Sequence, residues 1–208
     1  MTALIDVNGL LEGRWLLSHP FYRRWEAGEL SRTALATYAA QYAHVERQLP
    51  ATLEALAGAA GPGEVRDALA DNLADELGHP VAHVTLLQGF CDAVGATEQP
   101  PTAATEALVE LYASAAQRSV AFGLGVLAAY EVQAADVAAS KGDGLRAHYG
   151  VDASGTEFWD VHATMERDHA DWTVAAAATL ERAEVVAGVA ASRDAWWAFL
   201  DERALDAA

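Results

Sequence analysis

Three residues with metal-ligating side chains stand close together in the segment FWDVHATMERDHADW. His162, Glu166 and His169 are spaced at i, i+4 and i+7, so in a helix they would project from one face about two turns long. Two imidazoles and one carboxylate suit iron or manganese better than a metal that prefers thiolates. The spacing therefore predicts one half of a metal site. The alternative is a solvated helix face on which Glu166 pairs with His169 or Arg167.

A second group of candidate ligands lies in the segment DNLADELGHPVAH. Glu76 precedes His79 by three residues and His83 by seven, so either histidine would share its face of a helix. Pro80 lies between them and bends a helix, which weakens that expectation. A Glu followed by a His seven residues later is also common by chance, so this group is weak evidence by itself.

A third candidate is Glu131, in the otherwise apolar segment LGVLAAYEVQAADVA. An isolated buried carboxylate is very costly, so a buried Glu131 must be paired or bound to a metal; the alternative is a helix edge exposed to water. Together the three segments supply the ligands of two metal ions, namely Glu76, His83, Glu131, His162, Glu166 and His169. Facing helices that contribute inward Glu and His build the O2-activating di-iron and di-manganese sites of bundle proteins. We therefore expect an O2-activating oxidase.

The elements that must position these residues are predicted to be helices almost throughout. Ala, Leu, Glu, Arg and Gln dominate, and no clear run of alternating β-branched residues indicates a sheet. An opening helix is expected to continue over residues 10–17, a kink is expected at Pro50, and long helices are expected near 156–182 and 184–204. Breaks are expected at residues 19–20, 61–63, 78–80, 99–101, 116–125 and 141–144. The pattern predicts a single all-α domain over residues 1–208, a bundle of about seven or eight helices.

The composition limits the partners that this chain can bind. Its 208 residues, 52% of them apolar, fit one globular domain with a sizeable core. Thirty acidic against 13 basic side chains give a net charge of -17, which opposes nucleic-acid phosphates and anionic lipids. The longest apolar runs fall short of the roughly 20 residues that span a bilayer. We expect a soluble protein that binds neither nucleic acid nor membrane.

The cysteine and lysine counts are both one. Cys91 has no partner for an internal disulfide, and the segment MTALIDVNGL lacks the basic start and apolar run of a secretion signal, so a reducing cytoplasm is expected. The basic residues are arginines apart from Lys141. A codon bias that favours arginine accounts for most of this scarcity, but it leaves the position of the one lysine unexplained.

The segment SHPFYRRWEAGELSRTALATYAAQYAHV resembles the opening of the haem-oxygenase-like helical proteins, the superfamily of TenA thiaminases, the PqqC cofactor oxidase and the haem-oxygenase-like dimetal oxidases. The resemblance covers nearly the whole chain and implies a TenA/PqqC-like bundle. The chain is most similar to the CADD-type p-aminobenzoate synthases, whose ligand pattern is Glu-x6-His, a Glu preceded by Tyr, and His-x3-Asp-x2-His. The resemblance favours His83 over His79, and the chain departs from it at Glu166, where the family has Asp.

The resemblance also implies a function, because these synthases are understood to use their own tyrosine as the source of the aromatic ring and their own lysine as the source of the nitrogen. It implies an O2-dependent dimetal oxygenase, with Fe/Fe or Mn/Fe and an external reductant, that makes the folate precursor p-aminobenzoate in a single turnover. The matching positions are Tyr22 for the ring, Lys141 for the nitrogen, and Tyr38 and Tyr130 as supporting tyrosines. A homodimer is usual on this scaffold and is expected here.

The position of Lys141 is difficult to reconcile with this role. It lies ten residues past Glu131, which is about 15 Å along a straight helix, farther than a lysine side chain reaches. The helix must bend, or Lys141 must fold back from a helix end, where a cation is also favourable in its own right.

Three other functions remain open. One is a dimetal oxidase that acts on an external fatty acid or amino acid, and another is a metal-free TenA-like or PqqC-like enzyme. For a TenA-like enzyme the nucleophile would be Cys91, and its apolar surroundings argue against that role. The third is a non-enzymatic interaction module with an acidic core.

Overall fold

The chain folds into a bundle of helices, and the computed structural model describes residues 5–78 and 81–206, except the side chains of 166–168 and 206. In chain order the elements are α1 (Val7–Leu10), the 3-10 helix η1 (Leu16–Ser18), α2 (Pro20–Glu26), α3 (Arg32–Ala59), α4 (Glu64–Leu77), α5 (His83–Val94), α6 (Ala103–Arg118), α7 (Val120–Tyr149), α8 (Ala153–Ala177) and α9 (Arg182–Asp206). No strand occurs in the described part. The all-α prediction is therefore confirmed.

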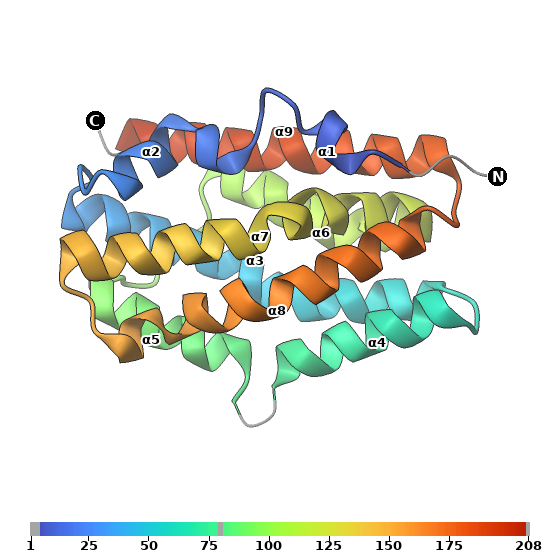
Figure 1. Cartoon of the computed structure of the whole chain (residues 1–208), viewed down its shortest axis with the longest axis horizontal. Helices are drawn as coiled ribbons and strands as arrows, with labels where there is room; N and C mark the ends of the chain where they lie inside the picture. The colour runs from blue at the N-terminus through green and yellow to red at the C-terminus, as the bar shows by residue number, and fades with distance from the viewer. Residues whose placement is uncertain (1–4, 79–80, 207–208) are drawn as a thin grey trace.

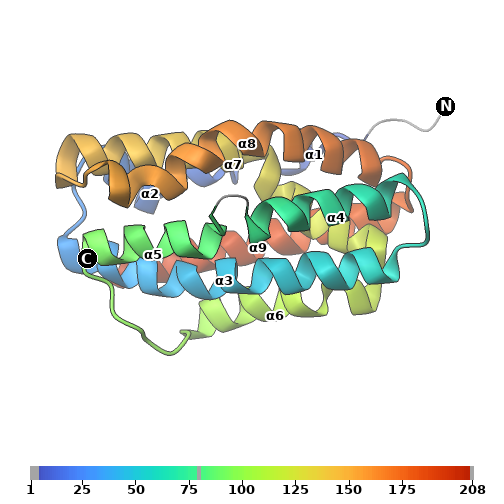
Figure 2. The ribbon, with the colours of Figure 1, turned by 90° about the horizontal axis from the view of Figure 1, so that it is seen from below.

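The long helices run roughly along one axis of the molecule (Figure 1). Helix α7 packs against α8 and α9, and α3 packs against α4, α5 and α6. Figure 2 shows α4 and α5 nearly in line, with both lying along the uninterrupted α3. Helix α4 ends at Leu77, and the Gly78 that caps it has a φ of 77°, in the left-handed region that favours glycine. The interruption places one end of α4 and one end of α5 opposite the middle of α3.

The predicted extent of the first helix is wrong. Helix α1 ends at Leu10 instead of continuing to Leu17, and Gly13, with a φ of 77°, lies in the turn that follows. Ser31 caps α3 as predicted, since its Oγ accepts a hydrogen bond from the Ala34 amide at 3.0 Å. Pro50 lies inside α3, which continues to Ala59.

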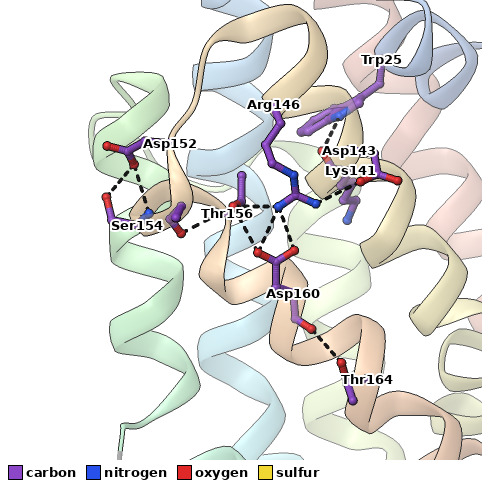
Figure 3. A network of polar contacts seen from close by, with 10 residues as sticks. Trp25, Lys141, Asp143, Arg146, Asp152, Ser154, Thr156, Asp160 and Thr164 are labelled. Carbon is purple, nitrogen blue, oxygen red and sulfur yellow. Dashed lines mark hydrogen bonds and ion pairs between the residues drawn. The ribbon is translucent and has the colours of Figure 1, made fainter.

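The expected helix end at Lys141 is also wrong, because α7 continues to Tyr149. Gly144 has a packing role there, since a Cβ on it would lie 2.7 Å from Trp25 Cδ1. The Trp25 indole donates a hydrogen bond to the Lys141 carbonyl at 3.2 Å, and Arg146 joins α7 to Asp160 of α8 at 2.9 Å (Figure 3). Close packing of α2 and α8 on this part of α7 therefore outweighs the low helix propensity of glycine.

Replacing Gly144 by alanine is expected to destabilise the fold by about 1–3 kcal/mol, because the new methyl group collides with the buried Trp25 ring. Gly58→Ala in α3 is the matched control, since no atom lies within 4 Å of its added Cβ. That substitution is expected to stabilise by about 0.5–1 kcal/mol through helix propensity alone. Urea unfolding of both variants measures the two changes, and changes of equal sign would contradict the packing role.

Helix α7 is the central element of the bundle. It has the length and apolar composition that crossing a membrane requires, but 78% of its most apolar stretch is buried inside the molecule. Its buried face includes one carboxylate, Glu131, and one amine, Lys141. This helix therefore carries two ionisable groups whose burial costs free energy unless they are paired or bound to another group.

Candidate metal centre

Three buried side chains from three helices converge near the break between α4 and α5. Glu76 lies in the last turn of α4, His83 begins α5, and His162 lies in α8. Their ligand atoms all lie within 4.8 Å of one another. Glu76 Oε2 is 3.1 Å from His83 Nδ1, and the two imidazole rings have centroids 4.5 Å apart. A carboxylate and two imidazoles at this spacing can hold one metal ion of the iron or manganese type.

The break in the helix explains how Glu76 and His83 meet. In one continuous helix, residues seven apart lie about 10 Å apart along the axis. The chain instead leaves the helix at Gly78 and enters α5 after Ala82, whose backbone is extended. The sequence pattern predicted a shared face of one helix, whereas in the structure the end of α4 and the start of α5 bring the two side chains together.

A small cavity of about 30 Å³ continues this cluster towards α7. Its charged and imidazole lining residues are Glu46, Glu76, Glu131, His162 and His169. Glu131 Oε1 accepts a hydrogen bond from Asn72 Nδ2 at 3.3 Å, whereas its Oε2 has no hydrogen-bond partner among the residues that the structure describes. A buried carboxylate oxygen that faces a cavity and accepts no hydrogen bond is suited to bind a metal ion, because a buried charge needs a partner.

The structure therefore brings five of the six predicted ligands to one place. Glu76 and His162 belong to both the three-residue cluster and the cavity, which Glu131 and His169 also line. His169 Nε2 is 3.1 Å from Asp75 Oδ2, a carboxylate just outside the cavity lining. The side chain of Glu166 and the rival ligand His79 lie outside the described residues.

Burial determines the protonation of these ligands. It lowers the pKa of His162 to about 4, so this imidazole is neutral at pH 7 and has a lone pair for a metal. It raises the pKa of Glu131 to about 7. For His83, burial lowers the pKa, but the hydrogen bond and the charge of Glu76 outweigh burial and leave the pKa above its usual value.

The affinity of the metal-free protein for Mn²⁺ is expected to rise with pH up to about 7. A metal ion must displace the proton of Glu131 and that of His83, whose pKa also lies above its usual value, so affinity should increase by at least about fivefold between pH 6 and pH 7 and level off once both groups have lost their protons. Calorimetric titration with Mn²⁺ measures this slope. Glu54→Gln, an exposed change in α3, should leave it unchanged. An affinity that is constant or falls with pH would contradict the assignment of Glu131.

Lys141 is completely buried and lies in a cage of aromatic rings. Its Nζ is 4.0 Å from the ring centroid of Trp159, 4.4 Å from Tyr42, 5.1 Å from Tyr38 and 5.2 Å from Tyr22. The Nζ atom has no hydrogen-bond partner within the described part of the chain. Burial lowers the pKa of the amine well below its usual value. A lowered pKa favours the uncharged amine, and that form is a nucleophile.

Four tyrosines connect this cage to the metal-ligand cavity. The hydroxyls of Tyr22 and Tyr38 share a hydrogen bond of 2.9 Å, and those of Tyr42 and Tyr130 share another of 2.9 Å. The rings of Tyr38 and Tyr42 stack with centroids 5.5 Å apart. Tyr130 lines the cavity next to Glu131. Tyr42, which the sequence reasoning missed, therefore joins the two pairs.

Glu46 is the second residue that the sequence reasoning missed. It is 7% exposed and lines the cavity from α3. Burial, together with the negative charge of Glu76, raises its pKa to about 7. Its signal in the sequence is the spacing of Tyr38, Tyr42 and Glu46 at i, i+4 and i+8, which places an acid on the apolar face of α3.

Cys91 lies apart from this site. Its Sγ is 3.9 Å from the Ala39 carbonyl, and it lines a different cavity together with His44 and Arg47. Burial raises the pKa of the thiol, which lowers its reactivity. The geometry therefore supports no thiol chemistry at the metal-ligand cavity.

Comparison with known sequences gives two matches that bear on this site. Residues 36–198 match the model of a family described as iron-containing redox enzymes. The 4-aminobenzoate synthase of Nitrosomonas europaea is 34% identical over 217 residues, which cover 94% of this chain and 88% of that protein.

Solved structures match over almost the full chain. A CADD-like protein of unknown function from Nostoc punctiforme has a TM-score of 0.81 at 22% identity, covering 97% of this chain and 95% of that one. A TenA homologue from Pseudomonas syringae has a TM-score of 0.82 at 17% identity, covering 97% and 94%. At these identities the likeness concerns the fold, and the predicted haem-oxygenase-like fold is confirmed.

Proposed function

The chain belongs to the family of iron-containing redox enzymes with the haem-oxygenase-like fold, and from this premise we propose that it makes 4-aminobenzoate (p-aminobenzoate) from its own side chains. Tyr22 supplies the aromatic ring and Lys141 the nitrogen, in a single O2-dependent turnover. One observation carries the proposal. The only lysine of the chain is buried with its amine 5.2 Å from the Tyr22 ring, and within the described part of the chain this amine has no hydrogen-bond partner that would account for its burial.

The metal ions of this proposal are Fe/Fe or Mn/Fe, held by Glu76, His83, Glu131, His162, Glu166 and His169. When bound, they supply the oxidising power by activating O2 with electrons from an external reductant. The protein supplies the rest. Burial raises the pKa of the Tyr22 phenol and keeps it protonated, and the Tyr38 hydroxyl fixes its position by a hydrogen bond. Burial also removes the Lys141 amine from water and lowers its pKa, which favours the uncharged form.

The size of the cavity favours a substrate that is part of the chain. Pockets that bind external ligands of drug size usually measure about 300–1,000 Å³. The cavity between Glu76, Glu131 and His162 measures about 30 Å³, close to the volume that one water molecule occupies in the liquid. A fatty acid or amino acid does not fit there without rearrangement, whereas the chain's own tyrosines connect the cavity, through Tyr130, to Tyr22 and Lys141.

Isotope labelling of the two residues tests the proposal. Protein made with ring-¹³C tyrosine and ε-¹⁵N lysine is loaded with Fe²⁺ without oxygen, reduced and exposed to O2. We expect 4-aminobenzoate that carries both labels, and peptides that have lost mass at Tyr22 and Lys141. Product without either label, or intact residues after product has formed, would overturn self-consumption. Many turnovers on an added substrate would indicate an oxidase for an external molecule instead.

A further inference from the structure

We infer that Asn72 and Asp75 of α4 are positioning residues, which determine the atoms through which Glu131 and His169 bind the metal ions. Neither of the two is among the six predicted ligands, but each hydrogen-bonds to one of them. The inference rests on the metal ligands of the proposed function, but not on the fate of any tyrosine or lysine.

The two side chains share one face of α4 with a metal ligand. Asn72, Asp75 and Glu76 are spaced at i, i+3 and i+4, so they lie close together on that face. Helix α4 packs mainly against α3, and Glu76 is the ligand that it supplies. Asn72 and Asp75 therefore connect α4 to the ligands that α7 and α8 supply.

The connection from Asn72 lies inside the protein. This side chain is 4% exposed and lines the metal-ligand cavity. Its Nδ2 donates a hydrogen bond of 3.3 Å to Glu131 Oε1. The other oxygen, Oε2, accepts no hydrogen bond in the part of the chain that the structure describes. Asn72 thus fixes the orientation of the carboxylate and leaves Oε2 to bind a metal ion.

The connection from Asp75 lies at the half-exposed edge of the site. Asp75 Oδ2 is 3.1 Å from His169 Nε2. A carboxylate can only accept a hydrogen bond, so Nε2 carries the proton and Nδ1 is the ring nitrogen that remains for a metal ion. Metal-binding histidines commonly donate their second N–H to a carboxylate, and losing such a partner weakens metal binding by about 10- to 100-fold.

His162 has the opposite arrangement on the same helix. Its Nδ1 donates to the Phe158 carbonyl at 2.7 Å, so Nε2 is the nitrogen that remains for a metal ion. The two imidazoles of α8 should therefore bind metal through different nitrogens, His162 through Nε2 and His169 through Nδ1. Sharing a helix does not produce this difference, whereas the position of Asp75 on α4 does.

Nitrogen NMR of the parent protein tests the choice of atom directly. Protein labelled with ¹⁵N-histidine is loaded with Zn²⁺, a diamagnetic ion that accepts imidazole and carboxylate ligands. The signals are assigned from those that disappear in His162→Gln and His169→Gln. We expect His169 to keep its proton on Nε2 and His162 to keep its proton on Nδ1. Zn²⁺ bound to Nε2 of His169 would overturn the role of Asp75.

Mn²⁺ affinities measure the contribution of Asp75. Asp75→Ala removes the acceptor and should weaken binding by about tenfold, whereas Asp75→Asn keeps an acceptor oxygen and should restore part of the loss. Asp71→Ala, on the same helix and exposed, is the matched control. It removes the same charge and should change the affinity by less than about twofold, because exposed charges are screened. Equal effects of Asp75→Ala and Asp71→Ala would overturn the positioning role.

Asn72→Leu keeps the approximate size of the side chain and removes its donor, so Mn²⁺ binding should weaken by about tenfold. Asn72→Ala, which adds no bulk, repeats the test, and circular dichroism checks the helix content of both variants. Unchanged affinity in either folded variant would overturn the role of Asn72. If these metal-binding results hold but the parent protein makes no 4-aminobenzoate, the proposed function fails and the inference stands. A parent protein that binds neither Zn²⁺ nor Mn²⁺ would refute both.

Discussion

Lys141→Met is expected to abolish 4-aminobenzoate formation and to make the protein more stable. No other side chain carries a primary amine, so the variant has no donor for the nitrogen. Methionine is about as long and as flexible as the lysine stem, so it fills the same space among the rings of Trp159 and Tyr42. Removing a buried amine that lacks hydrogen bonds should stabilise the fold by about 1–3 kcal/mol.

The gain in stability should depend on pH in a defined direction. Because burial lowers the pKa of Lys141, the native state binds fewer protons than the unfolded chain below the usual lysine pKa of 10.5. The parent protein therefore becomes more stable as pH rises towards 10.5, and the advantage of Lys141→Met shrinks. Glu46 adds to this trend. In Lys141→Met the Glu46 carboxyl loses the neighbouring amine that lowers its pKa, so its pKa rises further and the variant loses stability as pH increases.

Urea unfolding of metal-free protein between pH 6 and pH 10, with product assayed in parallel on iron-loaded protein, measures both effects. Arg66→Met removes an exposed cation from α4 and serves as the control, with an expected change within about 0.5 kcal/mol and unchanged product. Product from Lys141→Met would contradict the donor role. A stability difference that does not vary with pH would contradict the buried state of the amine.

The parts of the fold that could be predicted from the sequence depend on local interactions. The spacing of His162 and His169 and the cap at Ser31 follow from the geometry of a single helix, and the structure contains that cap and both side chains at the cavity. Glu131 was identified for a similar reason, because one acid in an apolar stretch of a helix is unusual wherever the helix packs.

The parts that could not be predicted depend on contacts between helices. Gly142 and Gly144 have the composition of a turn. In the structure they lie inside α7, where the absence of a Cβ lets Trp25 and side chains of α8 pack closely, and these contacts cannot be read from the local sequence. The expected helix end at Lys141 was wrong for that reason. Lys141 lies too far along α7 from Glu131 to react at the metal ligands themselves. That distance does not oppose a reaction with a tyrosine, because Tyr22 and Tyr42 approach the amine from other helices.

Glu46 illustrates a second limit. Its spacing from Tyr38 and Tyr42 places it on the apolar face of α3, but with Arg47 and Gln48 beside it the segment also has the pattern of a solvated edge. Its burial follows from the packing of α3 against α4 and from the cavity that α7 and α8 close, and none of these contacts is encoded near residue 46. Sequence spacing therefore identifies ligands that share a helix, but not a buried acid that a different helix brings to the same cavity.

Tyr22→Phe is expected to abolish product while the protein keeps its fold and binds metal normally. Phenylalanine retains the six ring carbons but lacks the hydroxyl that makes the ring readily oxidised and marks the carbon to which nitrogen is added. The variant leaves the Tyr38 hydroxyl without the 2.9 Å hydrogen bond, which should cost about 1–3 kcal/mol. Intact-mass analysis after exposure to O2 should show no loss at position 22, and Lys141 should keep its nitrogen.

Two tyrosine variants separate the chemical role of Tyr22 from the loss of a buried hydroxyl. Tyr149→Phe removes the hydroxyl that accepts a hydrogen bond from the Leu30 amide, so it costs similar stability, but it lies outside the cage and should leave product unchanged. Tyr38→Phe removes the partner of the Tyr22 hydroxyl without removing the source of the ring, so product should fall by about tenfold but remain detectable. If Tyr22→Phe still forms 4-aminobenzoate while Tyr38→Phe forms none, the ring comes from Tyr38, which is equally close to the amine at 5.1 Å.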